Sequence, residues 1–170
     1  MKHLLKWPLI VTLAVIVVRI ILEETGAPQA INTLFGVVWL QLLIPVYFGL
    51  TLAKNKILPP FLTLTKLVVL YALCARLLVL VSYSMAYVFQ WNAPRFSVAG
   101  GGVVGEGVGP LQGLLLTPAF NQIFWVIGGV VAGMILGSAT LAVGLHFARR
   151  SRATPPEEPY TPDSNESSAP

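Results

Sequence analysis

The sequence predicts an all-α, polytopic membrane protein, with four transmembrane helices in a small bundle and a disordered C-terminal tail. Hydrophobic residues make up 55% of the 170-residue chain and charged residues only 11%, whereas soluble domains carry about 25% charged residues. Four apolar stretches are long enough to cross the hydrocarbon core, which takes a helix of roughly 20 residues. Basic residues lie mainly at the ends of these stretches, a distribution typical of membrane topology.

The four predicted spans make up one transmembrane domain over residues 1–150. They cover residues 4–22, 33–53, 61–89 and 118–148. Signals for helix starts support two of these boundaries. Pro59 and Pro60 precede the third span, and Thr117 with Pro118 forms an N-cap and N1 pair before the fourth.

Two segments lie outside the predicted spans. Residues 90–117 form a Gly-rich outer loop containing AGGGVVGEGVGPLQG, which we expect to be mobile because glycine restrains the backbone little. Residues 151–170 form a Pro- and Ser-rich tail with almost no aliphatic side chains. Such a composition cannot bury a core, so we expect a disordered cytoplasmic tail.

The distribution of Lys and Arg predicts the orientation. In a four-span arrangement, eight of the eleven basic residues fall on one side of the membrane: Lys2, Lys6, Lys54, Lys56, Lys66, Arg149, Arg150 and Arg152. The opposite side carries only Arg95, apart from two arginines within the spans. The positive-inside rule then places both termini in the cytoplasm, and we expect the plasma (inner) membrane as the location.

The first apolar stretch also has the basic start and short apolar core of a secretory signal peptide. Arg19, Glu23 and Glu24 disrupt the region before any cleavage site, and GAPQA matches the small-residue cleavage pattern poorly. We therefore expect a retained transmembrane helix at residues 4–22.

Several function classes lack the residues that they require. The formal charge of +4 does not indicate nucleic-acid binding, because the basic residues form no stripe with interleaved aromatic side chains. Cys74 is the only cysteine, and His3 and His146 form no cluster with it, so we expect no zinc or haem site. The segment GGGVVG fits a dinucleotide-binding pattern but lies outside any βαβ unit. We expect no cofactor, no metal ion and no catalytic residue.

Charged residues inside the apolar stretches are the best clue to function. Arg19 and Arg76 each lie roughly 20 Å from the cytoplasmic start of their helix, at a rise of about 1.5 Å per residue. Both therefore reach a similar depth in the outer half of the membrane. Glu23 lies one turn beyond Arg19 on the same helix face. A charge at the bilayer centre costs about 2.5–3.5 kcal/mol on insertion scales, and pairing with an acid reduces that cost.

These depths predict one intramembrane polar cluster. Its candidate members are Arg19, Glu23, Glu24, Gln41, Arg76 and Tyr83. Two arginines against one or two acids leave a positive charge that would suit an anionic ligand or a lipid head group. The alternatives are a structural network that joins the helices and, for Arg19, a side chain that extends to the head groups.

The fourth span carries a face of small residues. Gly129, Gly133 and Gly137 follow a GxxxGxxxG pattern, which lets two membrane helices approach closely. The face could form a homodimer seam or pack inside the four-helix bundle, and we expect packing inside the bundle.

Three classes of function fit the sequence. The first is a small accessory or assembly subunit of a larger membrane complex, which suits the chain length and the absence of catalytic motifs. The second is an oligomeric carrier or channel protomer with the Arg/Glu/Gln cluster as its site. The third is a membrane enzyme acting on lipid or quinone, which would need an acid, base or metal in that cluster. We expect the first class, with the lipid bilayer, other membrane subunits or a second copy bound through the fourth span as partners.

Overall fold

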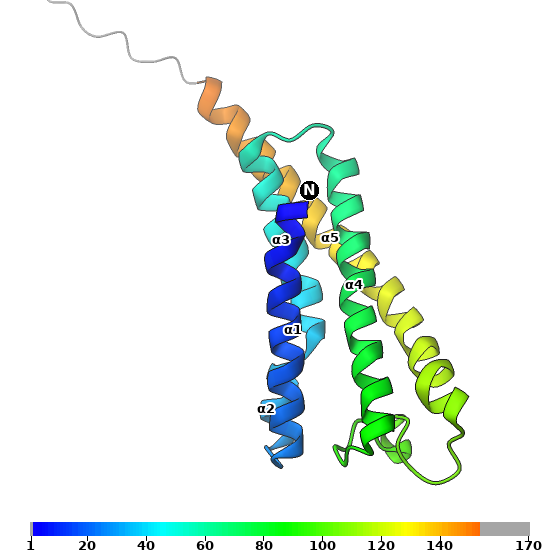
Figure 1. Cartoon of the computed structure of the whole chain (residues 1–170). Helices are drawn as coiled ribbons and strands as arrows, with labels where there is room; N and C mark the ends of the chain where they lie inside the picture. Colours follow the sequence, from blue (N-terminus) through cyan, green and yellow to red (C-terminus); the bar gives the residue numbers. More distant parts are fainter. Residues whose placement is uncertain (1, 154–170) are drawn as a thin grey trace, which may run out of the picture.

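The computed structural model describes residues 2–153, and these residues confirm the predicted all-α membrane fold (Figure 1). Four helical segments are long and apolar enough to cross a membrane: His3–Glu24, Gln29–Asn55, Pro60–Phe89 and Gln112–Ala148. The predicted disordered tail lies outside the described residues, except for the last residues of the final helix.

The spans are formed by the following helices: α1 (Lys2–Glu24), α2 (Gln29–Leu34), α3 (Val37–Asn55), α4 (Pro60–Phe89) and α5 (Thr117–Ala153). The second span is broken near one end, because Gly36 has an extended backbone and separates α2 from α3. A π-helical turn over Gln112–Leu116 leads into α5. The chain is therefore helical before Thr117, and the connection after α4 is shorter than the predicted loop over residues 90–117.

Successive spans run in opposite directions, so their connections lie at two ends of the bundle (Figure 1). The start of α1, the α3–α4 connection and the end of α5 lie at one end, here called the termini end. The α1–α2 connection and the loop after α4 lie at the other, here called the loop end. Helices α3, α4 and α5 pack against one another, and α1 packs on α4 and, to a smaller extent, on α3.

The half of the bundle toward the termini end is closed by a tightly packed apolar core. Phe48, Leu52, Leu64 and Leu141 are fully buried there, on three different helices. Tyr71 extends this core toward the middle of the bundle and packs edge-to-face on Phe48.

One buried hydrogen bond fixes α1 on the core. The Thr12 hydroxyl donates to the carbonyl of Pro8 at 2.8 Å, and it lies 2.9 Å from the Tyr71 hydroxyl. Since a hydroxyl has one proton, Tyr71 is the donor to Thr12. This bond joins α1 to α4, and both residues that form it are buried from lipid.

The glycine face of α5 lies against α3 and α4 of the same chain. A Cβ atom added at Gly133 would lie 2.9 Å from Pro45 Cγ, and one at Gly137 would lie 3.0 Å from the Pro45 carbonyl oxygen. One at Gly129 would lie 2.7 Å from Gln41 Nε2. Such distances are shorter than a normal carbon contact, so α5 approaches α3 this closely only because these positions lack side chains.

The outside of the bundle carries large apolar side chains on every span. Trp7, Leu43, Leu77, Phe124 and Ile135 are each about half exposed or more. In water such a surface would be unfavourable, and in a bilayer it is the lipid-facing surface. The chain is thus an integral membrane protein by the length, composition and surface of its helices.

The loop after α4 is packed rather than open, which differs from the prediction of a mobile segment. Phe96 and Val103 are fully buried and Ala93 nearly so. Phe96 packs edge-to-face on Tyr83 of α4. Backbone bonds between Phe96 and both Val103 and Val104 close the loop on itself. Aromatic and aliphatic side chains among the glycines therefore fix a segment whose glycine content alone suggested mobility.

Candidate functional site

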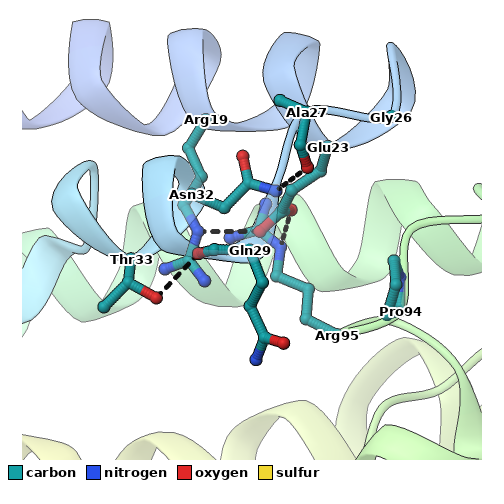
Figure 2. A pocket seen from close by; sticks show the side chains of 9 residues that line it. All are labelled: Arg19, Glu23, Gly26, Ala27, Gln29, Asn32, Thr33, Pro94 and Arg95. Carbon is teal, nitrogen blue, oxygen red and sulfur yellow. Dashed lines mark hydrogen bonds and ion pairs between the residues drawn. The ribbon is translucent and has the colours of Figure 1, made fainter.

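Glu23, near the end of α1, lies between two arginines at the loop end (Figure 2). Its Oε1 accepts a hydrogen bond from Arg19 Nε at 2.8 Å, one helical turn away. Its Oε2 forms an ion pair with Arg95 Nε at 2.6 Å. The Glu23 side chain is only 5% exposed, so a single buried carboxylate balances a guanidinium from α1 and another from the loop.

Arg95 belongs to this candidate site but is not among the residues predicted from the sequence. It lies in the loop after α4, outside the spans, and its guanidinium stacks 4.3 Å from the Phe96 ring centroid. Burial lowers the pKa of Arg95 below its ordinary value, and the Glu23 carboxylate acts in the opposite direction. One signal was available in the sequence. Outside the spans, Arg95 is the only basic residue predicted on the side of the membrane where Glu23 and Glu24 lie, and these two acids need partners.

Arg76 lies deeper in the bundle and has a different set of contacts. Its Nη2 donates a hydrogen bond to Gln41 Oε1 on α3, and its guanidinium lies 4.9 Å from the centre of the Trp125 ring on α5. The residue is 5% exposed. Within residues 2–153, no carboxylate lies within ion-pair distance of Arg76.

One cavity joins the two groups of contacts. It has a volume of about 200 Å³ and is lined by all three arginines, Arg19, Arg76 and Arg95. Tyr83 and Gln122 contribute polar atoms to the same wall. We call this space the arginine cavity. No carboxylate belongs to its lining among the described residues, because Glu23 faces the neighbouring space.

The charges around the arginine cavity do not cancel. Arg19, Arg76 and Arg95 supply three positive charges, whereas Glu23 and Glu24 supply two negative ones. Glu24 Oε1 accepts a hydrogen bond from the backbone N–H of Ala93 at 3.3 Å, so this acid holds the loop. With all five side chains ionised, one positive charge remains in excess.

Several buried polar atoms at the cavity have no partner within hydrogen-bond reach in the described part of the chain. They are Arg76 Nε, Arg95 Nη2 and Gln122 Oε1. Leaving a buried donor or acceptor unsatisfied costs about 1–3 kcal/mol. Two of these three atoms are guanidinium nitrogens, so the cavity offers unused donors to a group rich in acceptor oxygens.

A second space, here called the mouth cavity, lies on the other side of the Arg19–Glu23–Arg95 group. Its volume is about 350 Å³, and Gln29, Thr33 and Pro94 form an exposed rim at the loop end. Figure 2 shows the side chains of Arg19 and Arg95 directed toward Glu23 within this lining. Because Arg19 and Arg95 line both spaces, the mouth cavity and the arginine cavity adjoin at these two side chains.

The structure places the predicted cluster residues in one region but in two contact groups. In the first group, Glu23 contacts Arg19 and the loop, and Glu24 contacts the loop. In the second group, Gln41 contacts Arg76. Tyr83 lines the arginine cavity and packs on Phe96. Glu23 and Arg76 form no ion pair within the described residues. The cavity, rather than direct pairing, connects the two groups.

The arrangement is suited to binding and offers little for acid–base chemistry. Arginine stays protonated and only donates hydrogen bonds, so the three guanidiniums cannot serve as general bases. No group of three or more His, Cys, Asp or Glu residues able to hold a metal ion occurs within residues 2–153. The guanidinium groups of this site are suited to binding an anion.

Comparisons of the chain with models of known protein families, with curated protein sequences and with solved structures find no match. The function of this integral membrane protein is therefore inferred from the chemistry of its own residues.

Proposed function

We propose that this integral membrane protein binds a small anionic group in the arginine cavity, as a membrane carrier or receptor does. One observation carries the proposal: Arg19, Arg76 and Arg95 line a single cavity of about 200 Å³, and none of the described residues that line it is a carboxylate. Arginine donors in a site shielded from water bind carboxylate or phosphate oxygens through short, charge-assisted hydrogen bonds.

The partners of Arg76 support binding over a purely structural role. A structural arginine within a span is expected to pair with an acid, because a lone charge at the bilayer centre costs about 2.5–3.5 kcal/mol. Arg76 instead contacts a neutral amide and an aromatic ring, and its Nε is unpartnered within the described residues. An anion held in the cavity would supply the missing charge.

The packing of the rest of the bundle supports a binding site over a channel open at both ends. Phe48, Leu52 and Leu141 fill the half toward the termini end, so an open channel through the bundle would need this core to separate. The mouth cavity, in contrast, reaches the surface at the loop end. With the termini in the cytoplasm, as the basic residues predict, the cavity faces the outside of the cell.

The proposal is tested by the thermal stability of the purified protein in nanodiscs of phosphatidylcholine, titrated with sodium acetate or with inorganic phosphate at constant ionic strength. A ligand that binds only the folded state raises its stability in proportion to RT ln(1 + [L]/Kd). We expect a saturable rise in Tm with at least one of the two anions, which Arg76→Gln abolishes. Lys66→Gln, at an exposed cation near the termini end of the same helix, should respond like the parent. Equal responses in the parent and in Arg76→Gln would overturn the proposal.

An accessory role in a larger membrane complex stays a prediction. An affinity pull-down from native membranes checks it, because an accessory subunit should bring the same partners with it under mild detergent.

A further inference from the structure

A third space, here called the α4–α5 groove, lies on the lipid-facing side of the bundle. Its volume is about 310 Å³. It is lined mainly by apolar side chains, among them Leu73, Leu77, Leu80, Ile123, Val126 and Ile127. Leu77, Ile123 and Ile127 are each more than half exposed, so in a bilayer this groove opens to the acyl chains.

Two polar residues belong to both the groove and the arginine cavity. Arg76 and Gln122 are the only polar side chains of the groove among the described residues, and both also line the arginine cavity. Each is less than a tenth exposed and each has an unpartnered polar atom, Arg76 Nε and Gln122 Oε1. These two side chains therefore form the boundary between lipid and the cationic interior.

We propose that the anion is the carboxylate of a long-chain fatty acid, which reaches the site laterally from the bilayer between α4 and α5. The carboxylate lies on Arg76 in the arginine cavity, and the alkyl chain lies in the α4–α5 groove. This inference rests on the proposed function and names its ligand class.

Charge and polarity match this occupant. The region has one positive charge in excess, which a monoanion neutralises. The carboxylate oxygens can accept from the free Arg76 Nε and, after an amide flip, from Gln122. The other described residues that line the groove are all apolar, and an unbranched alkyl chain requires such contacts.

The depth of Arg76 favours a fatty acid over a phospholipid. Arg76 lies sixteen residues beyond Pro60 in the 30-residue helix α4, which places it about 24 Å along a helix of about 45 Å. Phospholipid phosphates lie outside a hydrocarbon core of about 30 Å, far from the middle of such a helix. A phosphodiester is charged at every physiological pH, whereas a carboxylic acid can be neutral and so can reach this depth.

Photo-crosslinking tests the inference on the full-length protein in phosphatidylcholine nanodiscs. The probe is palmitic acid with a diazirine in its alkyl chain, and the labelled peptides are identified by mass spectrometry. We expect labelling on α4 and α5 between residues 73 and 127. Unlabelled palmitate should compete at least ten-fold better than hexadecanol, which lacks the carboxylate, or than phosphatidylglycerol, which has two chains.

Two pairs of variants test the site of the alkyl chain and the site of the carboxylate separately. Ile123→Trp fills the exposed groove and should lower labelling at least ten-fold, whereas Leu43→Trp, at an exposed apolar position on α3, should leave it unchanged. Arg76→Gln should lower labelling to a similar extent, and Arg76→Lys, which keeps the charge, should restore part of it. The Tm of each variant without ligand checks that it folds.

The possible failures are distinguishable from those of the proposed function. If Arg76→Gln abolishes the acetate or phosphate response but Ile123→Trp labels like the parent, lateral binding of a fatty acid is wrong and anion binding stands. If hexadecanol or phosphatidylglycerol competes as well as palmitate, the ligand class is wrong. If neither the soluble anions nor palmitate depends on Arg76, both proposals are wrong.

Discussion

Glu23 Oε2 lies 2.6 Å from Arg95 Nε, so a residue near the end of the first span is ion-paired with a residue of the loop before the last span. The pair connects α1, the most peripheral long helix, to the packed loop at the loop end. It also places the Arg95 guanidinium at the boundary of the mouth cavity and the arginine cavity. The same contact therefore contributes to stability and to the shape of the candidate site.

A double-mutant cycle measures this pair. Glu23→Gln and Arg95→Gln should each lower the free energy of unfolding in detergent by about 1–3 kcal/mol, because each leaves a buried charged group with a lost partner. The double variant should lose less than the sum of the two, with a coupling energy of about 1 kcal/mol or more. The matched control is the cycle of Glu23→Gln with Arg76→Gln, whose residues share no ion pair, and we expect a smaller coupling there. Strict additivity in the first cycle would contradict the ion pair.

Arg76→Met is expected to change stability less than Glu23→Gln does. The substitution removes the hydrogen bond to Gln41, which is destabilising. It also removes a charge near the middle of a span, and the presence of such a charge costs about 2.5–3.5 kcal/mol. Replacing a poorly compensated buried charge with an apolar side chain is often neutral or stabilising. Chemical unfolding of both variants in the same detergent, without added anions, makes the comparison. A loss above about 3 kcal/mol for Arg76→Met would identify Arg76 as a structural anchor instead.

Gly133→Leu should destabilise the bundle by about 1–3 kcal/mol, the usual range for overpacking a tight contact. Even a Cβ atom there would lie 2.9 Å from Pro45 Cγ and 3.0 Å from Val68 Cγ1. Gly128→Leu is the control on the same helix, because a Cβ at Gly128 meets nothing within 4 Å. The Tm and the elution volume of each variant decide between two roles. A stable Gly133→Leu protein that elutes as a smaller species would instead place this face in a contact between copies.

The orientation can be tested by cysteine labelling in a Cys74→Ser background. Gly109→Cys lies at the loop end, where an added Cβ meets nothing within 4 Å, and His3→Cys lies exposed at the termini end. In intact cells, an impermeant maleimide should label Gly109→Cys and should reach His3→Cys only after the membrane is opened. The reverse pattern would mean that the termini end faces outward and that the arginine cavity opens to the cytoplasm.

The membrane class, the number of spans and the gathering of basic side chains at one end could all be predicted from the sequence. Each depends on a local property, since a span needs only a sufficient run of apolar residues. The rise of the helix also predicted that Arg19 and Arg76 lie in the same region, because depth along a helix follows from residue number alone. Where local composition misled, as in the Gly-rich loop, a few large side chains outweighed the glycines: Phe96 and Val103 are fully buried there.

Only the tertiary structure decided which residues meet. Depth does not determine how each helix is rotated, so the sequence could not show that Arg76 faces Gln41 and Trp125 rather than Glu23. Nor could it show that the loop returns over the end of α1 and brings Arg95 to Glu23. These contacts depend on how closely α5 approaches α3 and on the path of a loop, and both are set by packing between residues far apart in the chain. The arginine cavity is a product of that packing, because its three guanidiniums come from α1, α4 and the loop, which no local pattern relates to one another.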